Sequence, residues 1–330
     1  MIGLIILLLF VSKVARSISL VDISNEDRKD HLGTIPLVGG IGLFVSLVYG
    51  AFVFGVNSFY LYVLASLIPI MIIGTIDGIQ GVTIHPAYRV MGQIISCWIV
   101  IISTDIYVKN LGDIFGIGDI HLNQFGIPFT IFAVVGICNA FNMLDGKDGL
   151  LGSVSVIIMF SLFMLLLLNN IIYEWPLIIV LSILVFLTFN LSLFGEKRKI
   201  FLGDHGSNGL GFITAWSLIY LSQEANYITP ISAIWFVFLP LTDAILTFIR
   251  RVNSSKSIFD GDRLHFHHIL SDLGLNHVSI MIVCSFLTLL ACGIAIASNL
   301  FDFDEGFMFY IYLTVLVILS LNGILRSESK

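Results

Sequence analysis

Charged residues are scarce in this sequence. Lys, Arg, Asp and Glu make up 12% of the 330 residues, whereas hydrophobic residues make up 57% and the mean hydropathy is +1.00. A soluble globular domain carries roughly 25% charged residues, so the composition excludes an ordinary water-soluble enzyme. The formal net charge of −6 argues against a nucleic-acid partner, because such partners bind basic surfaces.

Cysteine is also rare. The four cysteines, Cys97, Cys138, Cys284 and Cys292, lie in apolar stretches and form no CxxC pair. The sequence therefore indicates neither a disulfide framework nor a cysteine-based zinc site, and we expect the thiols to pack as small hydrophobic groups. Low-complexity stretches are absent as well, so we expect residues 1–330 to form one transmembrane domain.

Long hydrophobic runs dominate what is present. A spanning helix needs about 20 apolar residues, and eleven stretches approach this length: 1–19, 36–56, 59–76, 90–108, 126–143, 150–169, 171–193, 208–222, 229–249, 277–298 and 306–325. We therefore expect an all-α polytopic membrane protein. If the spans alternate, all 16 basic residues except Lys109 fall on one side. Cytoplasmic loops are enriched in Lys and Arg, which predicts an N-terminus outside and a C-terminus in the cytoplasm.

Five polar clusters lie on the predicted cytoplasmic side. They are 28–31 with the following Pro36 and Gly39-Gly40, 77–78 with Arg89 and Gln93, 139–149, 201–208, and 260–268. Charged groups near hydrocarbon are costly and usually functional or paired. Because the loops are short, any chemistry must be built from loops and helix ends at this one face.

The first two clusters also have an ordinary structural explanation. Arg28, Lys29 and His31 can hold a phosphate, but basic loops are the usual cytoplasmic anchors of membrane proteins. The paired glycines after them permit either close approach to a ligand or a tight helix contact. Asp77 can take part in catalysis, but a lone aspartate at a helix end is commonly a cap or turn residue.

The central cluster carries the most specific pattern. Residues 139–149 read NAFNMLDGKDG, in which Asp145 and Asp148 stand three residues apart and Asn142 precedes Asp145 by one helical turn. Mg²⁺ takes oxygen ligands, often one or two carboxylates together with substrate phosphates. Asp-Gly pairs are common in turns, but two of them with paired asparagines exceed what a connecting turn requires.

The last two clusters favour phosphate chemistry. Residues 201–208, FLGDHGSN, precede a predicted helix, and helix N-termini attract anions; capping by Ser207 or Asn208 explains part of the pattern equally well. Residues 260–268 read DGDRLHFHH, a combination of arginine and histidines that suits diphosphate recognition. The alternatives there are zinc, although no cysteine is near, and a plain solvated loop.

In this order the motifs resemble those of the polyprenyl-phosphate N-acetylhexosamine-1-phosphate transferases of glycosyltransferase family 4. The resemblance runs over nearly the whole chain, and eleven spans is the usual count in that family. It rests on Arg28-Lys29-x-His31 with Pro36-x-x-Gly39-Gly40, Asn139-x-x-Asn142-x-x-Asp145-Gly-x-Asp148-Gly, Phe201-x-Gly203-Asp204-x-Gly206-Ser207, and Asp262-Arg263-x-His265-x-His267-His268.

The resemblance implies a reaction. N-acetylhexosamine 1-phosphate, most directly N-acetylglucosamine 1-phosphate, would pass from a UDP-sugar to undecaprenyl phosphate with release of UMP. Such a step initiates a cell-envelope polysaccharide of the O-antigen, enterobacterial common antigen, teichoic acid or capsule type, on the cytoplasmic face of the bacterial inner membrane among membrane lipids. Mg²⁺, or Mn²⁺ in its place, is the implied cofactor.

Alternatives to this reading stay open. They are transfer of a different UDP-N-acetylhexosamine, a membrane relative that has lost catalysis, and a lipid transporter, although no internal repeat typical of transporters is visible. The sequence does not fix the oligomeric state, and a homodimer is left open.

The resemblance also assigns roles to residues. Those expected to be catalytic are Asp77, Asp145, Asp148 and Asp204, with Asp145 and Asp204 as metal ligands. Those expected to bind substrate are Arg28, Lys29, His31, Asn142, Arg263, His265, His267 and His268. One departure is Gly78, where the family usually has a second aspartate after the first. Asp243, inside the ninth predicted span, is left without a role.

Overall fold

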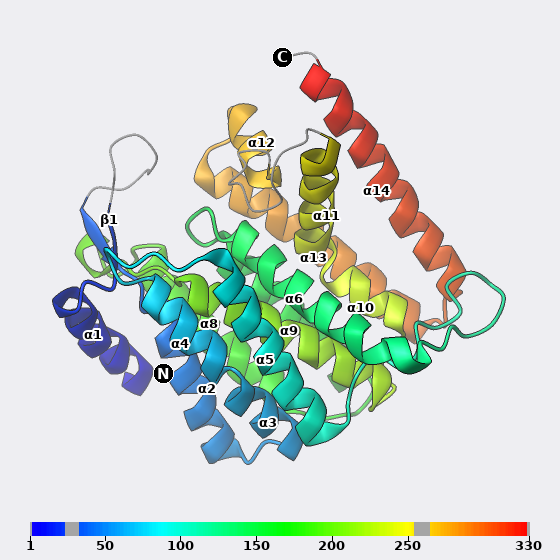
Figure 1. Cartoon of the computed structure of the whole chain (residues 1–330), viewed down its shortest axis with the longest axis horizontal. Coiled ribbons are helices and arrows are strands. Elements are labelled where there is room, and N and C mark those ends of the chain that lie inside the picture. Colours follow the sequence, from blue (N-terminus) through cyan, green and yellow to red (C-terminus); the bar gives the residue numbers. More distant parts are fainter. Residues whose placement is uncertain (1, 24–32, 254–264, 329–330) are drawn as a thin grey trace.

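The computed structural model describes residues 2–23, 33–253 and 265–328, mainly as a bundle of α-helices (Figure 1). Each predicted span corresponds to one helix or to two consecutive helices. The helices are α1 (Ile2–Ser17), α2 (Gly39–Phe54), α3 (Ser58–Ser66), α4 (Ile68–Asp77), α5 (Pro86–Thr104), α6 (Gly126–Leu144), α7 (Leu150–Leu168), α8 (Trp175–Asn190), α9 (Asp204–Gln223), α10 (Pro230–Phe236), α11 (Phe238–Asn253), α12 (Phe266–Asp272), α13 (His277–Leu300) and α14 (Glu305–Glu328).

Several helices have the length and composition of membrane spans. Within the described residues, five segments qualify on their own: Ser58–Asp77, Pro86–Thr104, Asn123–Leu144, Leu150–Leu168 and His277–Leu300. The bent pair α10–α11 would make a sixth, and α2, α8 and part of α14 are apolar but shorter. The chain is therefore a multi-pass helical membrane protein, whereas the count of eleven spans stays a prediction.

Helix α9 occupies the centre of the bundle. Residues 205–219 are all buried, and the helix contacts α2, α4, α6, α7 and α10. A helix buried on every side belongs to the interior of a bundle rather than to its surface. Its first residue, Asp204, is therefore fixed by neighbours on several sides at one end of the molecule.

The ninth predicted span, 229–249, is wrong as a continuous helix. It divides at Val237 into α10 and α11, which differ in direction by 85°. Pro240 explains the break, because proline has no N–H to donate to the carbonyl four residues earlier and its ring crowds that carbonyl. The carbonyl of Phe236, released in this way, accepts from Cys292 Sγ at 3.8 Å.

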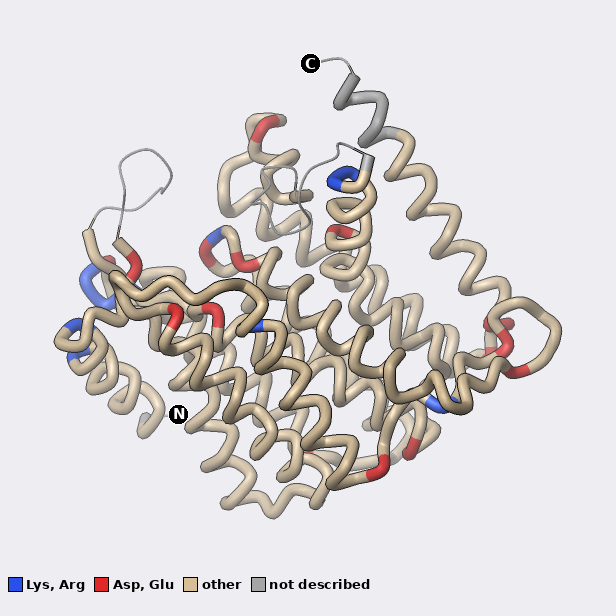
Figure 2. The backbone as a smooth tube through the Cα atoms, viewed as in Figure 1, with Lys and Arg blue, Asp and Glu red and all other residues tan. Residues whose placement is uncertain are grey.

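Two unpredicted elements lie in the segments that flank the spans. A short hairpin pairs β1 (Val21–Ile23) antiparallel with β2 (Thr34–Pro36), and Leu37 then forms a parallel bridge with Phe201. Helix α12 is the other, in the connection between α11 and α13. Figure 2 shows that charged residues gather near helix ends and loops, with long uncharged stretches between them.

Candidate active site

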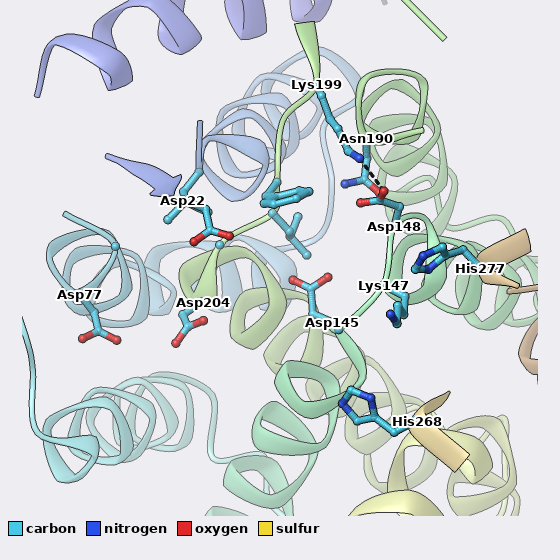
Figure 3. Close-up of a pocket in the computed structure, with 16 residues that line it drawn as sticks. Asp22, Asp77, Asp145, Lys147, Asp148, Asn190, Lys199, Asp204, His268 and His277 are labelled. Atoms are coloured by element: carbon cyan, nitrogen blue, oxygen red, sulfur yellow. Dashed lines mark hydrogen bonds and ion pairs between the residues drawn. The ribbon is translucent and has the colours of Figure 1, made fainter. Parts of the chain in front are cut away.

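A cavity of about 440 Å³ opens beside the first residue of α9. Its volume lies within the range of about 300–1,000 Å³ that is usual for small-molecule sites. Carboxylates and basic groups share its walls. The titratable residues that line it are Asp22, Asp77, Asp145, Lys147, Asp148, Lys199, Asp204, His268 and His277 (Figure 3).

Glycines bring the first turn of α9 against two other helices. A Cβ atom on Gly40 would lie 2.4 Å from the Cα atom of Gly206, and a Cβ atom on Gly74 would lie 2.6 Å from the backbone nitrogen of His205. Such distances exclude any residue with a side chain unless the backbone shifts. The paired glycines at 39–40 therefore serve a tight helix contact, one of the two explanations for this motif.

Arg89 joins two of the predicted catalytic carboxylates. Its guanidinium contacts Asp204 Oδ2 through Nη1 and lies 3.5 Å from Asp77 Oδ2 through Nε. Because Asp77 ends α4, Arg89 lies near the start of α5 and Asp204 begins α9, one planar side chain links three helices, as its several fixed donors permit. Asp77 also accepts from the backbone N–H of Ile84 at 3.2 Å, so its turn role and its place in the site coexist.

The paired asparagines of the central motif support α9 from α6. Asn142 donates through its amide to Asp204 Oδ1 at 3.2 Å. Three residues earlier, Asn139 donates to Gln93 Oε1 at 3.1 Å, and Gln93 donates to Asn208 Oδ1 at 2.8 Å. Such a network, with each polar group paired, rigidifies the packing of the three helices that carry it.

Asp145 follows the last residue of α6 and is exposed to the cavity. The surrounding protein displaces bulk water from its carboxyl, and this desolvation, followed by the negative charges of Asp204 and Asp148, raises the pKa of Asp145 to about 7. Both effects disfavour the ionised form. A cation bound between the carboxylates would relieve the repulsion.

The loop 145–149 after α6 is linked to residues 199–200, which precede α9. Lys199 Nζ lies 2.5 Å from Asp148 Oδ2 in the cavity wall. Asn190, the last residue of α8, accepts from the backbone N–H of Gly149 at 2.6 Å and donates to the carbonyl of Ile200 at 3.0 Å. One ion pair and one asparagine therefore set the distance between the two acidic motifs.

Among the predicted histidines that the structure describes, His265, His267 and His268, one lines the cavity. That residue is His268, whereas His265 and His267 are 7% and 1% exposed and lie behind it. His267 packs on the backbone of Gly146, where an added Cβ would lie 2.5 Å from Nε2. Burial, and then the neighbouring His268, lowers the pKa of His267 to about 3, so its ring is neutral and serves packing rather than charge.

The donor set suits a magnesium ion that binds together with its substrate. Asp145 and Asp204 both present carboxylates to the cavity. In the part of the chain that the structure describes, no group of three or more His, Cys, Asp or Glu residues converges on a metal position. Mg²⁺ is commonly held by one or two carboxylates plus substrate phosphates rather than by a complete protein cage, and two carboxylates fit that pattern.

The structure brings together six of the eight predicted site residues that it describes. Asp77, Asp145, Asp148, Asp204 and His268 line the cavity, and Asn142 contacts Asp204 beside it. Four other selected residues, Arg28, Lys29, His31 and Arg263, lie outside the described residues. The cavity therefore unites residues from four of the five polar clusters, which are far apart in the sequence.

Other residues that line the cavity, or contact its lining, were not predicted from the sequence as site residues. Asp22, Asn190 and His277 belong to segments without a recognisable motif, and only folding brings them to the site. Lys199 stands two residues before the motif that begins at Phe201, and this proximity was the available signal. Arg89 stands in the second polar cluster, but its position gave no indication that it bridges two aspartates.

The glycine that departs from the family pattern lies in the cavity wall. Gly78 follows Asp77 directly, and a Cβ atom added to it would meet side-chain carbons of Leu20 and Leu37 at 3.0 and 3.2 Å. A side chain at this position would therefore begin against these two leucines. With glycine here, Asp77, which contacts Arg89, carries the carboxylate of this pair of positions.

A bundle of apolar helices carries, at one end, a cavity lined by aspartates, lysines and histidines. These features define a multi-pass membrane protein with a polar site at the end of its helices. Comparison with known proteins agrees with this class. The model of glycosyl transferase family 4 matches residues 60–222. Together with the relatives described next, which cover up to 93% of the chain, this shows that the chain belongs to this family.

Three relatives illustrate the similarity, all named undecaprenyl-phosphate α-N-acetylglucosaminyl 1-phosphate transferase. The protein from Escherichia coli K12 is 32% identical over 314 residues, which cover 93% of this chain and 84% of the relative. The protein from Haemophilus influenzae is 34% identical over 313 residues, with 93% and 87% covered. The protein from Yersinia pestis is 35% identical over 272 residues, with 81% and 73% covered.

Proposed function

We propose that this protein transfers N-acetylglucosamine 1-phosphate from UDP-N-acetylglucosamine to undecaprenyl phosphate and releases UMP. The observation that carries the proposal is the cavity in which Asp145 and Asp204 meet basic side chains at one end of an apolar bundle. Such a position accepts a nucleotide sugar from water and a lipid phosphate from the headgroup layer. The relatives named for this activity match 93% of the chain, which supports the same assignment.

The reaction is a phosphoryl transfer. An oxygen of the lipid phosphate attacks the phosphorus that carries the sugar, and the bond from that phosphorus to the UMP oxygen breaks. UMP leaves with the bonding electrons, and a diphosphate now joins lipid and sugar. Catalysis of such transfers consists mainly of positioning and charge stabilisation. The lipid phosphate has a second pKa of about 6, so it is largely ionised near neutral pH and needs no general base.

The chain's own residues then have distinct tasks. Asp145 and Asp204 would hold Mg²⁺, which when bound neutralises charge on the diphosphate. Arg89 keeps Asp77 and Asp204 in a fixed relation through its two contacts. Lys199 and the other basic groups of the wall place positive charge near the phosphates, in a cavity where water is partly displaced and charge interactions are stronger than in bulk water.

We further propose that the chain crosses the membrane eleven times, with the cavity facing the cytoplasm of a bacterial inner membrane. Lys147, Lys199 and Arg89 lie at the cavity, whereas Lys109 follows the other end of α5. Enrichment of basic residues marks the cytoplasmic side. In this orientation the product is the first lipid-linked intermediate of a cell-envelope polysaccharide.

A transfer assay tests the proposed reaction. Purified protein in detergent receives undecaprenyl phosphate, Mg²⁺ and radiolabelled UDP-N-acetylglucosamine, and label in the organic phase is measured together with released UMP. We expect transfer by the wild type, a loss on the order of 100-fold in Asp145→Asn and Asp204→Asn, and no loss in Asp105→Asn, an aspartate that is 89% exposed at the other end of α5. Absence of label from folded wild-type protein would contradict the proposal.

The choice of sugar is tested in the same assay. Radiolabelled UDP-N-acetylgalactosamine replaces UDP-N-acetylglucosamine, and kcat/KM is compared for the two donors. We expect the larger value for UDP-N-acetylglucosamine, because the relatives at 32–35% identity are named for that sugar. A larger value for the other donor would keep the reaction class and reassign the sugar.

A further inference from the structure

Asp243 is a buried carboxylate that the proposed mechanism does not use. It lies on α11 and is 5% exposed, an environment in which an unpaired charge is strongly unfavourable. Two groups compensate it. Asp243 Oδ2 lies 3.1 Å from Nδ1 of His265, and Oδ1 accepts from the backbone N–H of Phe266 at 2.7 Å.

Both partners of Asp243 belong to the start of α12. The first N–H groups of a helix have no partner within the helix, and a side chain usually caps them. His265, in the cap position of α12, makes no side-chain capping bond. Asp243 therefore supplies the cap from another helix, 23 residues earlier in the chain. Its carboxylate also favours a proton on Nδ1 of His265, because a carboxylate only accepts.

Ring contacts among three histidines connect the Asp243–His265 contact to the cavity. The rings of His265 and His267 are stacked with centroids 5.8 Å apart and planes 6° apart, and the centroids of His267 and His268 are 4.2 Å apart. His267 is held from its other side by Gly146. His268, the last of the three, lines the cavity (Figure 3). The segment 265–268 therefore lies between α11 and the loop 145–149 that follows α6.

We infer that Asp243 is a positioning residue, whose carboxylate fixes the start of α12 and thereby the side chain of His268 in the cavity wall that receives the UDP-sugar. This inference rests on the proposed function, because it assigns the UDP-sugar to that wall. It predicts that changes at Asp243 act on the affinity for the nucleotide sugar rather than on the lipid acceptor.

The variant Asp243→Asn separates positioning from folding. The amide keeps nearly the same shape and retains an oxygen that accepts from Phe266 N–H, but its NH₂ group opposes the protonated Nδ1 of His265. Loss of the partner that orients a metal-ligating histidine typically costs about 10- to 100-fold, and we take the same scale for His265. We therefore expect the KM for UDP-N-acetylglucosamine to rise on the order of 10- to 100-fold, with the KM for undecaprenyl phosphate unchanged.

The adjacent residue provides a matched control. Thr242 is 4% exposed on the same turn of α11, and its hydroxyl lies 3.3 Å from the hydroxyl of Tyr312 in α14, away from the histidines. Thr242→Val therefore removes a buried hydrogen bond of the same helix without touching α12. We expect both KM values to stay at wild-type levels. Equal effects of the two variants would show that Asp243 is only a structural residue and would overturn the inference.

A double variant tests whether Asp243 acts through His268. Residues that act on one function as a unit give non-additive effects. We expect Asp243→Asn to change the KM for the UDP-sugar little further when His268→Ala is already present. Full additivity of the two changes would overturn the inference.

A binding measurement keeps the inference independent of turnover. The Kd for UDP-N-acetylglucosamine is measured calorimetrically without the lipid acceptor, and Asp243→Asn should raise it by the same factor as the KM. If the wild type binds but does not transfer, the proposed reaction fails while the effect of Asp243 can still be read. A Kd unchanged in Asp243→Asn would contradict the inference even if transfer is normal.

Discussion

At the scale of single residues, Asp145 shows how a carboxylate in the candidate site can oppose folding. Its pKa in the folded protein is about 7, against an ordinary value of 3.8, so the folded state binds a proton more tightly than the unfolded state does. The resulting stabilisation is complete below pH 3.8 and is lost as the pH rises to about 7. Above that pH the ionised carboxyl lowers the free energy of unfolding by a constant amount. A bound cation or a neutral side chain would remove this destabilisation.

Asp145→Asn should therefore stabilise the protein while it lowers transfer on the order of 100-fold. In thermal unfolding without divalent cations, we expect the gain in Tm over wild type to grow between pH 4 and 7 and to level off above pH 7, as the pKa of about 7 requires. Asp105→Asn, at an exposed site at the other end of α5, should show no such trend. A gain that is independent of pH would contradict the repulsion described for Asp145.

At the scale of elements, backbone contacts place α9. Gly40 on α2 and Gly74 on α4 leave no room for a Cβ atom against Gly206 and His205, so the end of α9 that carries Asp204 is held by close backbone packing. Contacts of this kind transmit any displacement directly to the site, because neither partner has a side chain that can rotate away.

Gly40→Ala is expected to destabilise the protein. The new methyl group would stand 2.4 Å from the Cα atom of Gly206, and overpacking of this kind costs about 1–3 kcal/mol, measurable as a lower Tm and reduced kcat. Gly136→Ala on α6 is the matched control, since an added Cβ there meets nothing within 4 Å and alanine is the better helix former by about 1 kcal/mol. Equal Tm values for the two variants would refute the packing argument.

The elements also show what the sequence can predict. Hydrophobic runs are local, so the predicted spans 126–143 and 150–169 nearly coincide with α6 and α7. The division of 229–249 was missed although Pro240 was visible, because the apolar run continues through it. The β1–β2 hairpin has strands of only three residues, too short for a periodic pattern, and the start of α12 is capped by Asp243 from another helix. The aspartates of the site stand in compact motifs, whereas Lys199 and His277 reach it only through the fold.

At the scale of the whole molecule, the orientation in the membrane is open to a direct test. All four cysteines are buried, as predicted from their apolar surroundings, so a maleimide that cannot cross membranes should label the wild type poorly. Asp105→Cys and Glu196→Cys each introduce an exposed thiol. The first follows the end of α5 that is far from the cavity, and the second lies in the connection between α8 and α9.

We expect Asp105→Cys to be labelled in intact spheroplasts and Glu196→Cys only after the membrane is permeabilised. The reason is the concentration of basic residues on the cavity side. Unfolding the protein in detergent before labelling provides the positive control for both thiols. The reverse pattern would place the cavity outside the cell and would exclude access to a cytoplasmic UDP-sugar.

The two ways in which the cavity is held have different evolutionary consequences. Around α9 the contacts are made by glycine backbones, where almost every replacement is harmful. The segment 265–268 is instead attached by side chains, through Asp243 and through ring packing. Paired substitutions can remodel such an attachment stepwise. Divergence in donor preference among descendants of this protein should therefore accumulate at α11 and α12, while the end of α9 that carries Asp204 stays invariant.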